Sequence, residues 1–421
     1  MGVRVSYGPT KVSVNVRGLL NVFKPAPVKP LGNWVDVLKE KLHAFIEGLK
    51  DVHPRSALVI IDDSTRPTPT SKVLPALTNA LSRTLGISLG SVTVLTALGT
   101  HRSMSEDELK RKLGPLWGAV RVVQHNAWDL SRAVNYGVLG YGVELLANLE
   151  LSSHDIKVGV GTIAPHVEAG WSGGGKIVLP GVSYVDTITK YHMLVPKSLE
   201  TVGLEAFVGS LNNPLRELSD RSARAVGLDM IVNTVLSLNG GVLGVFAGDP
   251  VKAHREGVSL AAEVFNPTFT EEADVVVVSA YPEDVDYWQA MKGELVSYPV
   301  VKSGGTIVLL ARCPEGLTRV EGFRSELVRL GRYSFKELAG MLKDGLLKES
   351  VPLAIAMELA KVREKAETLV VTEGLKPREC EAVGVRCFRD VNRALEEAYL
   401  VHGRDAATSV IETPLIAPKR G

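Results

Sequence analysis

Cysteine is scarce in this chain, which has 3 cysteines among 421 residues. Cys313, Cys380 and Cys387 are too few for a dense disulfide framework. Their spacing does not match the paired cysteines of a structural zinc site either. The cysteine content therefore suggests a protein of a reducing compartment, the cytoplasm.

An excess of charge of either sign is also absent, because 48 Lys and Arg residues stand against 47 Asp and Glu residues. Nucleic acids and anionic membranes bind strongly basic surfaces, so the balance argues against both as the main partner. No apolar run reaches the roughly 18 residues of a membrane span, and the first residues lack a signal-peptide core. We expect a soluble protein whose partner is a small molecule.

Apolar residues are plentiful and make up 45% of the chain. A chain of this length usually divides into domains, since single cores stop growing at about 250–300 residues. The predicted fold class is α/β, with two α/β domains and mainly parallel sheets. We expect an N-terminal domain at residues 1–270, a smaller doubly wound domain at 271–404, and a tail at 405–421 that could return to the first domain.

Three expected strands of the first domain each end directly in a polar loop. They are the apolar runs 56–61, 91–97 and 156–162, which lead into DDSTRPTP, LGTHR and IAPHVEAG. In open α/β sheets, ligands bind beyond the carboxyl ends of the strands. We therefore expect Asp63, Arg66, His101 and His166 to converge at one edge of the sheet.

Other patterns predict the scaffold around these strands. Apolar residues at helical spacing predict helices at residues 34–49, 212–227 and 252–263. Residues 229–249 are predicted to form a hairpin around Asn239 and Gly240, and Ser105 with Glu108 indicates a capping box. Buried-strand patterns at 273–280, 305–311 and 367–373 predict the second sheet.

The stretch from His166 to His192 holds a histidine, three glycines, a lysine and a second histidine. Without Cβ atoms, Gly173 to Gly175 could turn successive backbone N–H groups toward an anion. A P-loop is excluded because Ile177 stands where that motif needs Ser or Thr, and because Pro180 interrupts the helix that should follow.

Simpler interpretations remain open for each of these residues. Asp62 or Asp63 could cap the following helix, and a lone loop histidine is more often structural than catalytic. Two histidines at one sheet edge favour acid/base chemistry, since imidazole titrates near neutrality. Clustered histidines would also suit a zinc hydrolase, and the glycine loop with its lysine would suit a phosphate-binding module without catalysis. The structural histidines are expected to be His125, His154 and His254.

Several short motifs occur in one order along the chain: DSTRP, GTH, PH followed by SGGGK and YH, and then WQAMK. In this order they resemble the lactate racemase family, and the resemblance covers most of the chain. Members of that family carry a nickel-pincer nucleotide, a pyridinium mononucleotide that holds nickel through two sulfurs and a ring carbon.

The resemblance implies a role for each matching residue. Lys176 matches the lysine that anchors the cofactor covalently, and His192 matches the nickel ligand. His101 and His166 match the acid/base pair. The loop that contacts cofactor and substrate comprises Asp63, Ser64, Thr65 and Arg66, and the substrate carboxylate would be held by Arg66, Gln289 and Lys292.

The activity implied is racemisation or epimerisation of a 2-hydroxy acid by reversible hydride transfer from Cα to the bound nucleotide. The active site would lie in the cleft between the two domains. The partners implied are the small acid itself and the cofactor-synthesis enzymes needed for maturation. The motifs do not identify the acid, and the aromatic residue that some members contribute from the late part of the chain has no clear match here.

Overall fold

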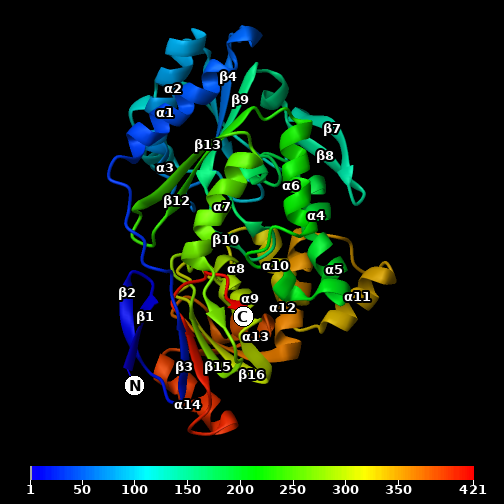
Figure 1. Ribbon diagram of the computed structural model, residues 1–421. Coiled ribbons are helices and arrows are strands. Elements are labelled where there is room, and N and C mark those ends of the chain that lie inside the picture. Colours follow the sequence, from blue (N-terminus) through cyan, green and yellow to red (C-terminus); the bar gives the residue numbers. More distant parts are fainter. Residues whose placement is uncertain (1) are drawn as a thin grey trace.

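The computed structural model describes residues 2–421 and contains two six-stranded sheets, in the upper and lower halves of Figure 1. The first sheet has the strand order β13-β12-β9-β4-β5-β6. Its strands are β4 (Ala57–Asp62), β5 (Val92–Ala97), β6 (Arg121–Gln124), β9 (Ile156–Thr162), β12 (Met230–Leu236) and β13 (Val242–Gly248). All neighbours are parallel except β12 and β13, which form the expected antiparallel hairpin.

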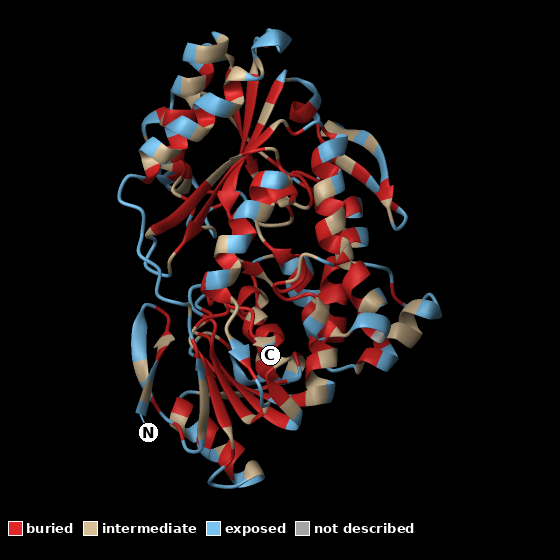
Figure 2. Ribbon diagram, viewed as in Figure 1, coloured by how far each residue is buried: buried red, intermediate tan, exposed pale blue. Residues whose placement is uncertain are grey.

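Helices cover both faces of the first sheet. Successive side chains of a strand point to opposite faces, so Val59 packs against α1 (Trp34–Glu47) and α2 (Thr70–Leu85), whereas Ile60 lies in the other cluster. That second face is covered by α6 (Pro214–Ala225) and α7 (Lys252–Phe265). Burial on both faces accounts for the unbroken apolar run of β4, and Figure 2 shows the strands buried between exposed outer helix faces.

The second sheet is entirely parallel and has the order β18-β17-β16-β15-β19-β3. Its strands are β3 (Leu19–Phe23), β15 (Ala273–Ser279), β16 (Val301–Leu310), β17 (Ala366–Val371), β18 (Arg386–Phe388) and β19 (Thr408–Ile411). One face packs against α14 (Val391–His402), and the other against α9 (Lys292–Ser297) and α12 (Val351–Lys365). The three strand patterns expected here are confirmed as β15, β16 and β17.

Segments near both chain ends contribute to the second sheet. The strand in the tail, β19, lies between β15 and β3, and β3 belongs to the N-terminal segment that was expected in the first domain. The connection after α14 is short, so the chain comes back to the sheet on which that helix lies. The last residues do reach the first domain, where Lys419 Nζ donates to the Val208 carbonyl at 2.7 Å. The boundary at residues 270 and 271 stays a prediction.

Shorter elements complete the structure. The remaining helices are α3 (Glu106–Leu113), α4 (Val185–His192), α5 (Leu194–Val202), α8 (Tyr287–Ala290), α10 (Glu321–Leu330), α11 (Phe335–Lys343) and α13 (Pro377–Ala382). The remaining strands pair two by two: β1 (Gly2–Tyr7) with β2 (Thr10–Asn15), β7 (Ala133–Gly140) with β8 (Val143–Asn148), β10 (Pro165–His166) with β11 (Gly170–Trp171), and β14 (Thr268–Phe269) with β20 (Lys419–Arg420). Over residues 2–421, none of the helices is both long and apolar enough to span a bilayer.

Two local features bear on the sequence expectations. The capping box is confirmed, since the Ser105 hydroxyl accepts from Glu108 N and the Glu108 carboxylate accepts from Ser105 N. Cys380 and Cys387 form a disulfide, while Cys313 is free and buried. The cysteine count did not reveal this pairing, because connectivity depends on the distance between the two residues in the fold.

Candidate active site

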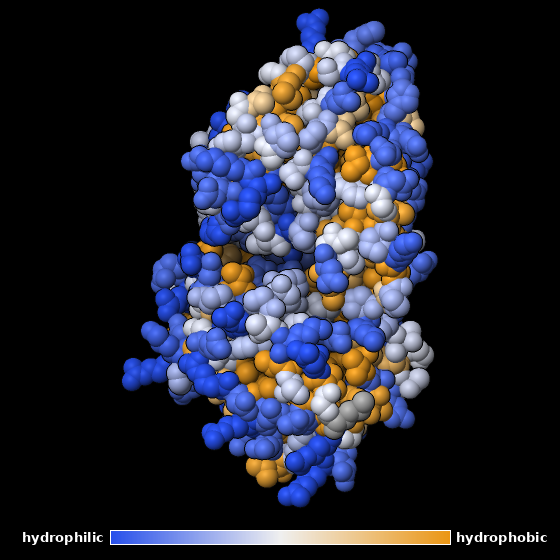
Figure 3. Space-filling model, turned by 90° about the vertical axis from the view of Figure 1, so that its left-hand side faces the viewer, coloured by the Kyte–Doolittle hydropathy of each residue, from blue (hydrophilic) through white to orange (hydrophobic). Residues whose placement is uncertain are grey.

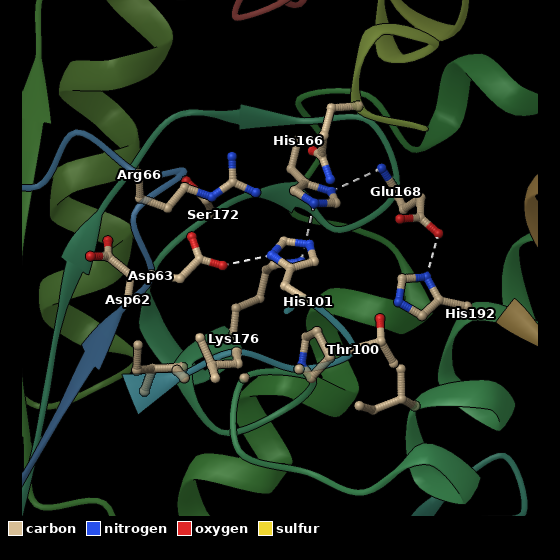
Figure 4. Close-up of a pocket in the computed structure, with 18 of the residues that line it drawn as sticks. Asp62, Asp63, Arg66, Thr100, His101, His166, Glu168, Ser172, Lys176 and His192 are labelled. Carbon is tan, nitrogen blue, oxygen red and sulfur yellow. Dashed lines mark hydrogen bonds and ion pairs between the residues drawn. The ribbon is translucent and has the colours of Figure 1, made fainter. Parts of the chain in front are cut away.

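The three polar loops meet in one cavity of about 160 Å³ that both domains line. From the first domain come Asp63, Arg66, His101, His166, Lys176 and His192. From the second come Gln289 and Lys292, together with Trp288 and Met291. Figure 3 shows the surface hollowed between the two halves of the molecule, and Figure 4 shows the polar side chains converging. The expected convergence at the carboxyl ends of β4, β5 and β9 is confirmed.

His101 is oriented by a carboxylate. Its Nδ1 lies 2.6 Å from Asp63 Oδ2, and Asp63 Oδ1 in turn accepts from Thr65 N at 2.8 Å. Burial raises the pKa of Asp63, but the nearby His101 and Arg66 outweigh it and hold the carboxyl well below its usual range. An ionised Asp63 accepts the Nδ1 proton, which leaves the lone pair of His101 Nε2 free to act as a base.

His166 has the opposite arrangement. Its Nδ1 faces two backbone donors, Glu168 N and Ala169 N, each at 3.2 Å. A neutral ring that accepts at Nδ1 carries its proton on Nε2, and Nε2 lies 3.2 Å from Lys176 Nζ. Burial lowers the pKa of His166 well below its usual value, and the nearby Lys292 and Arg66, with Lys176 while it is protonated, lower it further. In this arrangement His166 donates through Nε2.

Lys176 is the partly buried nucleophile candidate of the cavity. Burial lowers its pKa to about 7, with Arg216, Arg66 and Lys292 acting in the same direction and Glu168 against it. When neutral, its amine can accept a hydrogen bond from the Nε2–H of His166. A neutral amine is the form that attacks an electrophile, so this lysine is suited to covalent attachment near neutral pH.

His192 lies at the end of α4 and is paired with Glu168. Its Nδ1 is 2.6 Å from Glu168 Oε1, and both side chains are largely buried. Histidines that ligate metals almost always donate their other ring N–H to a carboxylate or carbonyl, which fixes the ring and the tautomer. His192 therefore has the supporting contact of a metal ligand, with Nε2 as the nitrogen left for the metal.

Arg66 and Lys292 are brought together across the domains by Glu283. Arg66 Nη1 donates to Glu283 Oε1 at 2.6 Å, and Lys292 Nζ donates to Glu283 Oε2 at 2.5 Å. Lys292 Nζ also donates to Gln289 Oε1 at 2.6 Å. The two cations and the amide thus form one group on the cavity wall, as expected for a carboxylate-binding site.

A second buried carboxylate supports the loop that carries Arg66. Asp62 accepts from Lys112 Nζ at 2.6 Å and from the Thr68 hydroxyl, and Lys112 Nζ also donates to the Arg66 carbonyl at 2.9 Å. Thr68 continues the network to Thr162 at 2.7 Å. The ends of β4 and β9 are therefore tied together beneath the cavity. Asp62 therefore supports the loop through Lys112 and Thr68, and it does not cap α2.

Close packing around the loop requires glycine at positions 174 and 175. A Cβ on Gly174 would lie 2.8 Å from His254 Cγ, and one on Gly175 would lie 2.0 Å from the Ser219 carbonyl oxygen. Gly174 N donates inward to Asn233 Oδ1 at 2.8 Å. These contacts account for the glycines without an anion, so they give no support to a phosphate-binding module. The loop continues as a 3-10 turn, Gly174–Ile177, and not as the α-helix of a P-loop.

Other expected site residues lie at the margin of the cavity. Ser64 donates to Glu108, and Thr65 donates to Asp63, and both line a neighbouring hollow that also borders His101. These contacts hold the loop from Asp63 to Arg66 in shape. The late part of the chain lines the cavity with Val351 and Ile355 of α12, which are aliphatic.

The three histidines expected to be structural have structural contacts. His125 and His254 are buried and lie 2.8 and 2.9 Å from the backbone carbonyls of Ser183 and Ser172. His154 lies between the Glu150 carbonyl and Thr93. Within residues 2–421, no group of three or more His, Cys, Asp or Glu side chains is arranged to hold a metal. The geometry therefore offers no three-ligand zinc site of the hydrolase type.

Three residues of the site were not identified from the sequence: Glu168, Glu283 and Lys112. Glu168 stands two residues after His166, in a motif already singled out. Glu283 lies 217 residues from Arg66 and 9 residues from Lys292, and Lys112 lies 50 residues from Asp62. No local pattern could have paired them.

Two family models match the chain. The lactate racemase N-terminal domain matches residues 6–202, and the lactate racemase C-terminal domain matches residues 269–415. A lactate racemase of Thermoanaerobacterium thermosaccharolyticum is 28% identical over 319 residues, which cover 75% of this chain and 70% of that protein. A lactate racemase of Lactiplantibacillus plantarum is 28% identical over 378 residues, which cover 88% and 85%.

Solved structures show the same fold. The lactate racemase apoprotein from Thermoanaerobacterium thermosaccharolyticum superimposes with a TM-score of 0.88 at 24% identity, over 100% of both chains. A Thermotoga maritima protein gives a TM-score of 0.76 at 19% identity, over 94% of this chain and 100% of that one. The mainly parallel α/β architecture with two domains is thus shared across the full length.

Gly175→Ala is expected to destabilise the protein by about 1–3 kcal/mol, because the new methyl group would overlap the Ser219 carbonyl. The free energy of unfolding, measured with denaturant, checks this. Gly340→Ala is the matched control, since it lies within α11 with no atom within 4 Å of the new Cβ. It should be stabilising by roughly 0.5–1 kcal/mol. Equal effects of the two substitutions would show that the loop can move away.

Lys176 is expected to react with acetic anhydride half-maximally at about pH 7, since a lysine with a lowered pKa is neutral above that value. Exposed lysines should require a higher pH, toward the ordinary lysine pKa of roughly 10.4. Mass spectrometry of the labelled peptides over a pH series measures both in one sample. Labelling of Lys176 in parallel with the exposed lysines would contradict the lowered pKa.

Proposed function

Because the chain belongs to the lactate racemase family, we propose that it is a nickel-dependent racemase or epimerase of a 2-hydroxy acid. The observation that supports this most directly is one cavity in which Lys176, paired His192 and two further histidines meet a carboxylate-binding group. Maturation would need cofactor-synthesis enzymes. A cytoplasmic location follows from that need, although the disulfide gives it no support, because disulfides are rare in reducing compartments.

The residues of the cavity fit a nickel-pincer nucleotide. Lys176 provides an amine that is neutral near pH 7 for the covalent link. His192 is held by Glu168 through Nδ1, which leaves Nε2 as an imidazole donor for nickel. One imidazole beside the soft sulfur and carbon donors of the nucleotide suits four-coordinate nickel. When bound, the nucleotide supplies an acceptor for the hydride of the substrate Cα.

The residues of the chain bind the acid and move its hydroxyl proton. Arg66, Lys292 and Gln289 hold the substrate carboxylate, so that the remaining freedom of the acid lies at Cα. A histidine takes the hydroxyl proton as Cα is oxidised, and a 2-keto acid results. The keto group then presents its other face. As hydride returns to Cα on that face, a histidine gives a proton to the oxygen, and the opposite hand forms.

His101 and His166 divide this work in the proposal, one for each hand. His101 can act as the base, because Asp63 accepts the proton on its Nδ1 and leaves Nε2 unprotonated. His166 carries its proton on Nε2. To accept a proton at Nε2, the ring would first have to change tautomer, so that Nδ1 carries the proton and no longer accepts from Glu168 N and Ala169 N. Covalent use of Lys176 would remove its amine from His166, so loading of the cofactor changes the surroundings of this ring.

Intact mass and metal measurements on protein made together with the cofactor-synthesis enzymes test the cofactor assignment. We expect added mass on Lys176 and bound nickel in the wild type, and neither added mass nor nickel in Lys176→Ala. His192→Ala should keep the added mass and lose nickel, because the covalent link is independent of the ligand. Lys190→Ala, an exposed lysine on α4, is the control and should keep both.

Other outcomes of the mass and metal measurements point elsewhere. Retention of the full added mass in Lys176→Ala would reject this lysine as the anchor, and unchanged nickel in His192→Ala would require a different ligand. Zinc as the sole metal would favour a hydrolase. Neither metal nor added mass would favour a binding protein without catalysis.

His101→Ala and His166→Ala are each expected to lower racemisation by about 10²–10⁴-fold, because each full turnover uses both histidines. Each variant should still oxidise one hand of the acid. Single-turnover mixing with pure D-lactate or pure L-lactate, followed by quenching and assay of 2-keto acid, should show opposite preferences. Exposed His43→Ala on α1 is the control. Equal loss with both hands in both variants would refute the division of labour.

A further inference from the structure

From the position of Glu283 we infer that this residue sets the net charge of the carboxylate-binding group, Arg66, Lys292 and Gln289, and fixes the positions of its two cations. As a result, the site selects acids with one carboxylate over acids with two. The inference rests on the proposed function and specifies its substrate class. Glu283 is a positioning residue, because it supports Arg66 and Lys292 from outside the cavity and is not among the residues that line it.

The contacts of Glu283 use both of its oxygens. Oε1 accepts from Arg66 Nη1 at 2.6 Å and Oε2 accepts from Lys292 Nζ at 2.5 Å. The Glu283 side chain is 9% exposed and that of Lys292 is 13% exposed. Burial raises the pKa of Glu283, but Lys292 and Arg66 outweigh it and lower the pKa to about 2. The carboxylate is therefore ionised throughout the physiological range.

Both cations keep donors for a ligand. A guanidinium has five N–H donors, and Glu283 is paired with Arg66 through Nη1 alone. An ammonium has three, of which Glu283 and Gln289 take two from Lys292. A substrate carboxylate can thus bind beside Glu283 without displacing it.

Together, Arg66, Lys292 and Glu283 carry a net charge of one positive unit. Arg66 and Lys292 contribute two positive charges and Glu283 contributes one negative charge, so a single substrate carboxylate neutralises the group. The carboxylates that line the cavity are Asp62, Asp63 and Glu168. Asp63 and Glu168 are paired with His101 and His192, and Asp62 is paired with Lys112. In the cofactor-loaded protein Lys176 carries the cofactor, so a second substrate carboxylate would enter the cavity without a free lysine or arginine to meet it. The cost of this grows in a low-dielectric site.

Glu283 also acts across the domains. Arg66 follows β4 of the first sheet, whereas Glu283 and Lys292 follow β15 of the second. The carboxylate joins them over 217 residues of sequence. A substitution that keeps the charge of Glu283 but shortens its side chain should allow Arg66 and Lys292 to move apart. A substitution that keeps its shape but removes its charge should change the preference between acids with one and with two carboxylates. The two effects can be separated experimentally.

The test is isothermal titration calorimetry of the cofactor-loaded protein with racemic lactate and racemic malate, which carry one and two carboxylates. Racemic acids are already at equilibrium, so turnover adds no heat. We expect the wild type to prefer lactate. Glu283→Gln should shift the ratio of the two dissociation constants toward malate by at least about tenfold, since a unit charge a few ångströms away contributes on this order.

Two further variants complete the design. Glu283→Asp keeps the charge and shortens the side chain, so it should weaken both acids while keeping the preference for lactate. Glu397→Gln removes the same charge from an exposed pair with Arg386 and should change neither acid. A merely structural role for Glu283 would weaken both acids in Glu283→Gln without moving their ratio.

The outcomes separate this inference from the proposed function. Binding of lactate by the wild type with an unchanged ratio in Glu283→Gln would overturn the role of Glu283 and leave the racemase proposal standing. A wild type that prefers malate would also overturn it. Absence of binding of either acid to every form of the protein would overturn the carboxylate-binding group itself, and with it both proposals.

Discussion

Charge compensation in a buried cavity is the constraint on which the rest of the site depends. Ionised groups are costly to bury unless they are paired and hydrogen-bonded. Four carboxylates provide the pairing here: Asp63 for His101, Glu168 for His192, Glu283 for Arg66 and Lys292, and Asp62 for Lys112. Each of these carboxylates fixes the orientation of its partner, so compensation of charge also gives the site its geometry.

The same contacts give different chemical properties to residues of the same type. His101 has an ionised carboxylate at Nδ1, His166 has two backbone N–H groups there, and His192 has the buried Glu168. These contacts leave the first ring a lone pair at Nε2, give the second an N–H at Nε2, and leave Nε2 of the third without a contact to Glu168. Lys176 and Lys292 differ for the same reason, because a carboxylate contacts only Lys292 directly.

Two sheets are needed to bring these groups together. The first sheet presents three loops at the carboxyl ends of β4, β5 and β9, and the second domain supplies Gln289 and Lys292 from α8 and α9. One apolar cluster extends across both domains, including Ile60 of β4 and Ile355 of α12. Closure of the cavity therefore depends on the packing that joins the domains as well as on the active-site residues.

Much of this protein follows from local sequence. Apolar runs of strand length, each ending in a polar loop, are sufficient to predict the parallel sheet and the convergence of Asp63, Arg66, His101 and His166, because side-chain burial and strand direction are local properties. Family motifs add Lys176, His192, Gln289 and Lys292. The disulfide, the place of β19 and the carboxylates Glu168 and Glu283 were decided by tertiary structure alone. Each depends on how separate elements are placed in space. Even Cys380 and Cys387, with a sequence separation of 7, belong to different elements, α13 and β18, and a pattern within one element carries no information about its distance to another.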